Sequence, residues 1–137
     1  MVPLRAMTAH VRYLGNLQTT CTHASGEVIQ TDAPIDNHGE GRYFSPTDLM
    51  ATSLASCFLT IVGIYCREHG ISFHGAAIDV TKIMASNPRR IAEIKLTIDL
   101  SENHWDAATQ KKVIAAGKAC PVAATLKDQV KIDYQFV

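Results

Sequence analysis

The sequence has few charged residues and no excess of either sign. Only 19% of its 137 residues are charged, and 13 Lys and Arg balance 13 Asp and Glu. No run exceeds two or three like charges, so the chain lacks the electrostatic footprint that a phosphate backbone or an anionic lipid surface attracts. We therefore expect no nucleic-acid partner and no membrane partner.

The sequence also lacks paired cysteine motifs. No Cys-x-x-Cys pair occurs, which excludes a zinc ribbon and a thioredoxin-type motif. Cys66, His69 and His74 have no fourth partner at usable spacing, so no metal site is expected. The four cysteines lie far apart, at Cys21, Cys57, Cys66 and Cys120.

An unbroken apolar stretch of the secretory type is missing from the start of the chain. Met1 to Val11 alternates polar and apolar residues and contains Pro3, which favours a cytoplasmic location. With 47% hydrophobic residues, the chain can build a core without disulfide bonds. We expect a single domain spanning residues 1–137.

Short alternating segments and tight turns fill the first third of the sequence. Strands are expected around residues 11–13, 17–21 and 28–29, with turns at Gly15-Asn16 and Ser25-Gly26. Asp32 to Phe44 is polar and glycine-bearing, which is typical of a long surface loop that carries function.

A long uncharged helix is expected next. Ser45 can cap it, Pro46 suits its first position and Asp48 can complete a capping box. Leu49 to Cys66 has no charged residue and meets the length criterion for a membrane span, but its small polar residues favour a central buried helix. A sheet covers only one side of such a helix, so a second copy of the chain is expected on the other, forming a homodimer.

The second half of the chain reads as a hairpin, two helices and a strand. Ile94, Leu96, Ile98 and Leu100 alternate with polar residues in a half-solvated antiparallel hairpin that turns at residues 86–88. Asn103 is expected to cap a helix from about residue 104 to 118, and a short helix through residue 126 and a strand over 130–136 follow. Grouped strands and grouped helices predict an α+β fold with helices packed on antiparallel sheet.

Two cysteines have surroundings that suit chemistry, whereas Cys21 and Cys66 are expected to be buried bystanders. Cys57 has small, slightly polar neighbours at helical spacing, which leave room for a substrate, for another thiol or for close packing of a second helix. Cys120 precedes Pro121 and is expected at a helix cap, where unpaired amides favour the thiolate.

The motifs around these cysteines resemble the osmotically inducible protein C and organic hydroperoxide resistance family (OsmC/Ohr). The first runs from Ser45-Pro46-Thr47-Asp48-Leu49 to Ala55-Ser56-Cys57-Phe58, and the second is Lys118-Ala119-Cys120-Pro121-Val122. The order of elements agrees along nearly the whole chain. The resemblance implies an OsmC-like fold, with antiparallel sheets packed on a long central buried helix in an intertwined homodimer.

The resemblance further implies a thiol-dependent peroxidase that acts in oxidative or osmotic stress. Cys57 takes the place of the peroxidatic cysteine and Cys120 that of the resolving cysteine. The substrate would be a small organic hydroperoxide, and no cofactor is implied. An external dithiol would reset the pair; in the hydroperoxide-resistance branch it is carried by a lipoylated protein.

The sequence departs from the family at the group that activates the thiol. The family commonly has a Glu ten residues before the peroxidatic cysteine, paired with an Arg, and here Thr47 stands at that position. Asp48 lies about 100° further around the helix, and Arg42 is the best-placed cation. A cysteine in an apolar helix needs a nearby cation to ionise at neutral pH, so Arg42, Thr47 and Asp48 are candidate thiolate-stabilising or substrate-positioning residues.

Two other functions compete with the peroxidase. One is a non-peroxidase OsmC-like stress protein that binds an apolar small ligand at the dimer interface, and the other is a structural dimer with inert thiols. Reaction of Cys57 with an alkyl hydroperoxide would distinguish the peroxidase from the binding protein and from the structural dimer.

Overall fold

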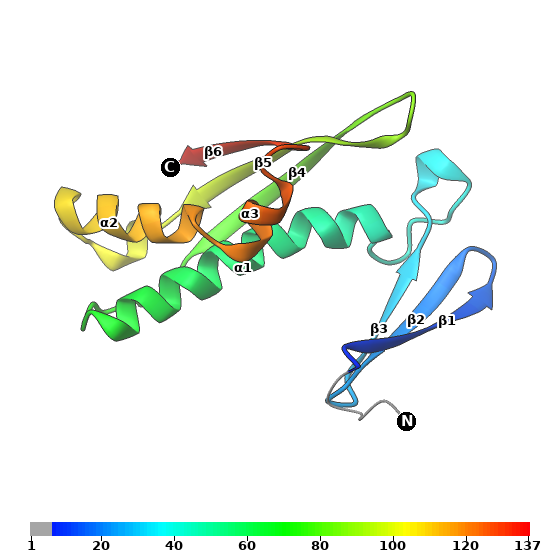
Figure 1. The fold of residues 1–137 in the computed structure, drawn as a ribbon, viewed down its shortest axis with the longest axis horizontal. Helices are drawn as coiled ribbons and strands as arrows, with labels where there is room; N and C mark the ends of the chain where they lie inside the picture. Colours follow the sequence, from blue (N-terminus) through cyan, green and yellow to red (C-terminus); the bar gives the residue numbers. More distant parts are fainter. Residues whose placement is uncertain (1–6) are drawn as a thin grey trace. The chain divides into compact units, whose positions relative to one another are not determined.

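The computed structural model describes residues 7–137 (Figure 1). The expected absence of a secretory stretch falls partly on residues 1–6, outside the described residues. The elements are β1 (Ala9–Gly15), β2 (Gln18–His23), β3 (Val28–Asp32), η2 (Ile35–Asn37), α1 (Pro46–Glu68), β4 (Ala77–Ala85), β5 (Arg90–Asp99), η3 (Ser101–Asn103), α2 (Ala107–Lys118), α3 (Pro121–Leu126) and β6 (Lys131–Phe136).

Two compact units divide the chain between Leu49 and Met50. We call them the N-terminal unit and the C-terminal unit. The expectation of a single domain over residues 1–137 stays a prediction.

The N-terminal unit is the antiparallel meander expected from its turns. β2 lies between β1 and β3, and the β1–β2 turn places Asn16 and Leu17 at positive φ. The sheet buries little in a single chain, because four of its large apolar side chains are at least half exposed. They are Val11, Tyr13, Val28 and Ile29.

The start of α1 confirms the predicted capping box. The backbone N–H of Asp48 donates to Ser45 Oγ at 3.0 Å, and the backbone N–H of Ser45 donates to Asp48 Oδ2 at 2.9 Å. These reciprocal bonds satisfy two amides at the end of the helix, and Pro46 occupies its first position.

One face of α1 is buried in the core of the C-terminal unit, whereas Met50 and Ile64 are about half exposed in a single chain. By length and composition alone α1 could also cross a membrane, but core helices of soluble proteins pass the same test, so this is weak evidence. The buried face consists of Ala51, Leu54, Ala55, Phe58, Val62 and Cys66.

The C-terminal unit pairs its three strands in the order β4-β5-β6 (Figure 1). The predicted hairpin is confirmed: β4 and β5 are antiparallel, and Ile94, Leu96 and Ile98 are fully buried. β6 instead pairs parallel to β5, so this sheet is mixed and not antiparallel throughout. α2 and α3 form the crossover that a parallel pair of strands requires.

Asn103 does not cap α2, contrary to expectation. The helix begins at Ala107 and its cap is Asp106, whose side chain accepts from the backbone N–H of Thr109 at 2.7 Å. Asn103 is buried in η3, where its Nδ2 donates to the carbonyl oxygens of Gly75 and Leu100. The position of Asn103 in the sequence suited a helix cap, but in the folded chain its side-chain amide is buried and bonds to backbone carbonyl groups.

Trp105 lies just before α2 and ties two segments of the C-terminal unit together. Its Nε1–H donates to the carbonyl oxygen of Ser72 at 2.9 Å, and its ring centroid lies 5.8 Å from that of Phe73.

Candidate active site

Cys57 lies half-buried on α1 beside small polar residues, as the helical spacing predicts. Ser53 and Thr60 turn their hydroxyls back onto the helix, donating to the carbonyl oxygens of Met50 and Ser56 at 2.6 and 2.8 Å. The hydroxyl donors of Ser53 and Thr60 are thus used within the helix.

Cys120 is the cap residue of α3, as predicted from Pro121. Its Sγ accepts a hydrogen bond from the backbone N–H of Ala123 at 3.4 Å. The side chain has no exposed surface, and this burial is the main cause that raises the pKa of the Cys120 thiol. The prediction that the cap lowers this pKa is therefore wrong: the amide of Ala123 acts in that direction, but burial outweighs it.

The two thiols are neighbours in the C-terminal unit, although they belong to different helices. The hydrogen bond and the charge of Cys57 both help to raise the pKa of Cys120. Among the described residues all four cysteines are free thiols. The Cys57 thiol is thus close enough to affect the ionisation of Cys120.

An aromatic cluster that the sequence did not identify lies in the same unit, and one of its rings, Tyr134, is close to Cys120. The Phe58 ring lies 6.0 Å from Tyr134 and 6.4 Å from Phe136, and Lys118 Nζ lies 5.0 Å from the centroid of Tyr134. Burial, followed by the charge of Cys120, raises the pKa of Tyr134. The alternation along β6 pointed to Tyr134 and Phe136, but it did not indicate that Tyr134 lies near Cys120.

A groove of ≈ 530 Å³ opens beside Cys120. The end of α2, α3 and the first part of β6 form its walls. Its lining residues are Lys118, Ala119, Cys120, Ala123, Ala124, Lys127, Val130, Lys131, Ile132 and Tyr134.

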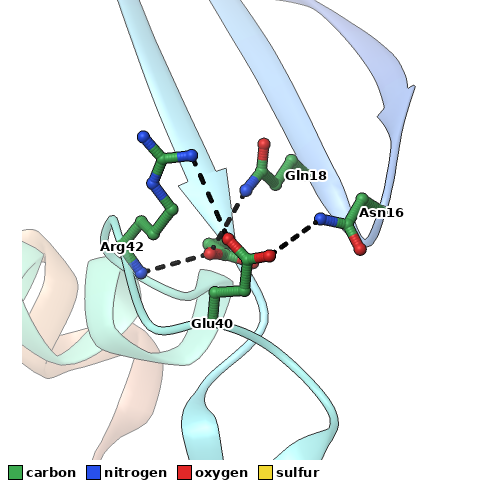
Figure 2. Close-up of polar contacts among 5 residues, drawn as sticks. Asn16, Gln18, Glu40 and Arg42 are labelled. Carbon is green, nitrogen blue, oxygen red and sulfur yellow. Dashed lines mark hydrogen bonds and ion pairs between the residues drawn. The ribbon is translucent and has the colours of Figure 1, made fainter.

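Arg42 lies in the N-terminal unit within a polar cluster (Figure 2). Its guanidinium lies 4.0 Å from the Glu40 carboxylate and 5.7 Å from the centroid of the Tyr43 ring. Asn16 Nδ2 donates to Glu40 Oε1 at 3.2 Å. The Arg42 side chain is more than half exposed, so its charge remains accessible from water.

Asp32 was expected to begin a surface loop, but it ends β3 and is fully buried. Its Oδ2 accepts from the backbone N–H of Arg42 at 3.1 Å and from Gln18 Nε2 at 3.4 Å, while Oδ1 has no hydrogen-bond partner among the described residues. The carboxylate thus holds the segment that carries Arg42. The sequence pattern did not predict that Asp32 is buried, because this residue stands between a short strand and a polar loop.

The other two candidates of the N-terminal unit lie at the start of α1. Thr47 Oγ1 lies 3.2 Å from Ser45 Oγ, and Asp48 completes the capping box. Asp48 and Arg42 line one groove of ≈ 500 Å³ together with Ile29 and Phe44. The structure therefore gathers Arg42 and Asp48 in the N-terminal unit, and Cys57 and Cys120 in the C-terminal unit.

Of the remaining cysteines, Cys66 is buried as expected, whereas Cys21 is only half-buried. Cys66 is buried in the core, and burial raises the pKa of its thiol. Cys21 is half-buried in β2 and lies 3.8 Å from Thr19 Oγ1. Over residues 7–137, no group of three or more His, Cys, Asp or Glu side chains could hold a metal ion.

Comparison with known proteins shows the same family across most of the chain. The family model described as "OsmC-like protein" matches residues 39–135. A curated relative from Mycoplasma genitalium, "Organic hydroperoxide resistance protein-like", is 27% identical over 86 residues, which cover 62% of this chain and 61% of that protein.

Solved structures have the same fold. A crystal structure named for an osmotic stress induced and detoxification response protein of Psychrobacter arcticus is 42% identical, with a TM-score of 0.89 over 96% of each chain. OhrB of Bacillus subtilis, named an organic hydroperoxide resistance protein, is 17% identical, with a TM-score of 0.71 over 96% of this chain and 99% of that chain.

Proposed function

Because the chain belongs to the OsmC-like protein family, we propose that it is a cofactor-free, thiol-dependent peroxidase that reduces organic hydroperoxides in stress defence. The observation that carries this proposal is the proximity of the Cys57 and Cys120 thiols. The names of its relatives, which refer to organic hydroperoxide resistance and osmotic stress, support a stress-related redox function.

The proposed reaction has two steps on the protein. The Cys57 thiolate attacks the O–O bond of the hydroperoxide, which releases an alcohol and leaves a sulfenic acid on Cys57. The Cys120 sulfur then attacks the Cys57 sulfur, and the sulfenic hydroxyl leaves as water with the proton of the Cys120 thiol. An external dithiol reduces the resulting disulfide; a lipoylated protein remains the candidate carrier.

Cys57 and Cys120 have different proposed roles that follow from their surroundings. Cys57 is half-buried beside small side chains and can meet a substrate, whereas Cys120 has no exposed surface and its raised pKa keeps it protonated at neutral pH. A buried, protonated thiol is a poor first nucleophile toward peroxide, which favours Cys57 as the peroxidatic residue.

A thiol count with intact mass tests this proposal. One equivalent of an alkyl hydroperoxide should remove two thiols per chain and form one internal disulfide. Cys57→Ser should abolish the reaction, and Cys120→Ser should stop it at a sulfenic acid that dimedone traps. Cys21→Ser and Cys66→Ser are matched controls that should keep it.

The result that would favour the competing binding function is a Cys57 that does not react with peroxide. The groove of ≈ 530 Å³ beside Cys120 is the observation that supports this second candidate. In that case the protein would be an OsmC-like stress protein that binds an apolar small ligand.

Arg42 is proposed to stabilise the thiolate or to position the substrate, and Thr47 and Asp48 remain candidates for the same roles. Its accessible guanidinium and its ion pair with Glu40 support this role. Arg42→Ala should lower kcat/KM for peroxide. Arg12→Ala, which removes an exposed Arg of β1, is the matched control.

A homodimer in the cytoplasm completes the proposal. Exposed apolar side chains on the β1–β3 sheet and on α1 support a second copy of the chain as the partner. Sedimentation equilibrium should give twice the chain mass of 14.9 kDa; a monomer at micromolar concentration would contradict it.

A further inference from the structure

The carboxylate of Asp32 is a costly group in the N-terminal unit. Its residue has no exposed surface, and its Oδ1 has no hydrogen-bond partner among the described residues. Removing a charged group from water is unfavourable unless all of its hydrogen bonds are replaced. A buried carboxylate with an unpartnered oxygen therefore needs an explanation other than packing.

The other oxygen of this carboxylate bonds to the backbone of Arg42. Asp32 Oδ2 accepts from the backbone N–H of Arg42 at 3.1 Å and from Gln18 Nε2 at 3.4 Å (Figure 2). A hydrogen bond to a charged acceptor is about twice as strong as one between neutral groups. The bond therefore fixes the point from which the guanidinium side chain extends.

The loop over residues 33–44 has other bonds that close it. The backbone N–H of Asp32 donates to the carbonyl oxygen of Phe44 at 3.2 Å. Inside the loop, the N–H of Gly41 donates to the carbonyl oxygen of Ala33 at 3.2 Å. The side chain of Asp32 thus adds to a loop that backbone bonds already close, and it adds its bond at Arg42.

The contacts at the other end of the Arg42 side chain are weak. The guanidinium lies 4.0 Å from the Glu40 carboxylate, and both side chains are more than half exposed. It also lies 5.7 Å from the centroid of the Tyr43 ring. Water and salt screen an ion pair of this kind, so it contributes little to the placement of the charge. The placement of the guanidinium therefore depends on the anchored backbone.

We propose that Asp32 is a positioning residue that acts through Arg42 in the reaction with hydroperoxide. This inference rests on the proposed function, in which Arg42 stabilises the Cys57 thiolate or positions the substrate. Loss of the Asp32 bond would let the backbone of Arg42 shift. A misplacement of about 1 Å in a group that orients the reacting atoms can lower a rate about 10²-fold.

A double-mutant cycle tests whether Asp32 acts through Arg42. The reduced protein reacts once with tert-butyl hydroperoxide, and the loss of thiols with time gives a second-order rate constant. Asp32→Ala should lower this constant by about ten- to hundredfold in the parent chain. In the Arg42→Ala background the same change should alter it by less than about twofold, because coupled sites are not additive. Effects that simply multiply would overturn the proposal.

Asp32→Asn is a second variant that keeps an acceptor oxygen but loses the charge. It should lower the rate constant about threefold, since the neutral bond is weaker, and it should have no effect in the Arg42→Ala background. A rate equal to that of the parent, or below that of Asp32→Ala, would overturn the proposal. Asp36→Ala is the matched control, because it removes an exposed carboxylate of the same loop; its rate should equal that of the parent.

Two measurements separate positioning from a loss of fold. Circular dichroism at the assay temperature should show that each variant is folded. Reduction of the oxidised protein by dithiothreitol, a step in which Arg42 has no proposed role, should proceed at the same rate in Asp32→Ala and in the parent; a parallel loss in both steps would overturn the positioning role.

The outcomes also distinguish this inference from the function on which it rests. If the parent chain loses no thiols to peroxide, the proposed function fails. If the parent reacts but Arg42→Ala reacts equally fast, or the two substitutions act independently, the positioning role of Asp32 alone fails.

Discussion

The backbone N–H of Ala123 donates a hydrogen bond to Cys120 Sγ across 3.4 Å. This contact fixes the sulfur at the start of α3, where its side chain is shielded from water. The amide contact lowers the pKa of this thiol, but burial has the larger effect and raises it.

Alkaline pH should destabilise the fold. Burial raises the pKa of Cys66, Cys120 and Tyr134, so the folded state retains protons that the unfolded state releases. Their contribution is fully present below the unfolded values of about 8.5 for Cys and 10 for Tyr, and is lost as pH rises through the folded values. Urea unfolding of the reduced protein at pH 7–10 measures this loss.

Cys66→Ala is the matched variant for that measurement. It removes one of the three groups, so its free energy of unfolding should fall less steeply between pH 8.5 and 10 than that of the parent. A parent stability that is flat or rises over this interval would contradict the prediction.

Asp32→Ala should destabilise the N-terminal unit by about 1–3 kcal/mol, because it removes the buried carboxylate that accepts from the N–H of Arg42. Asp32→Asn should cost less, since an amide oxygen can accept the same bond. Denaturation followed by circular dichroism provides the measurement. Gln18→Ala, which removes only the longer 3.4 Å bond, should cost less than about 1 kcal/mol; equal losses for Asp32→Ala and Gln18→Ala would be inconsistent with this role.

Two glycines in helices should respond oppositely to alanine. A Cβ at Gly117 would lie 2.6 Å from the buried Phe58 ring, and overpacking costs about 1–3 kcal/mol. A Cβ at Gly63 would lie 3.9 Å from Phe73, so Gly63→Ala should gain about 0.5–1 kcal/mol from helix propensity. Thermal unfolding should place the two variants on opposite sides of the parent.

Mutation can distinguish the roles of Asn103 and Asp106, the two polar residues before α2. Asp106→Ala removes the cap and should cost about 1 kcal/mol. Asn103→Ala should cost about 2 kcal/mol or more, because it leaves the N–H of His74 and the carbonyl oxygens of Gly75 and Leu100 without their partner. A greater loss for Asp106→Ala would contradict the buried role of Asn103.

Local patterns in the sequence predicted local structure well. Ser45 and Asp48 form the capping box that their spacing indicates, and Ile94, Leu96 and Ile98 are buried as their alternation requires. The motifs around Cys57 and Cys120 correctly indicated the family.

Features that depend on contacts between distant segments could not be predicted from local sequence patterns. Asp32 and Asn103 look like loop and cap residues, because short polar side chains favour both settings, and only the folded chain supplies the backbone partners that bury them. The parallel pairing of β6 with β5 has no local signal either, since alternation gives no strand direction.

Trp105 provides a fluorescence probe in the C-terminal unit alone. It is the sole tryptophan of the sequence and is bonded within the C-terminal unit, to Ser72. Its fluorescence therefore reports on that unit, while far-ultraviolet circular dichroism reports on the strands and helices of both units. The two spectroscopies together measure whether the units unfold as one cooperative body, because coincident transitions are the mark of a two-state change.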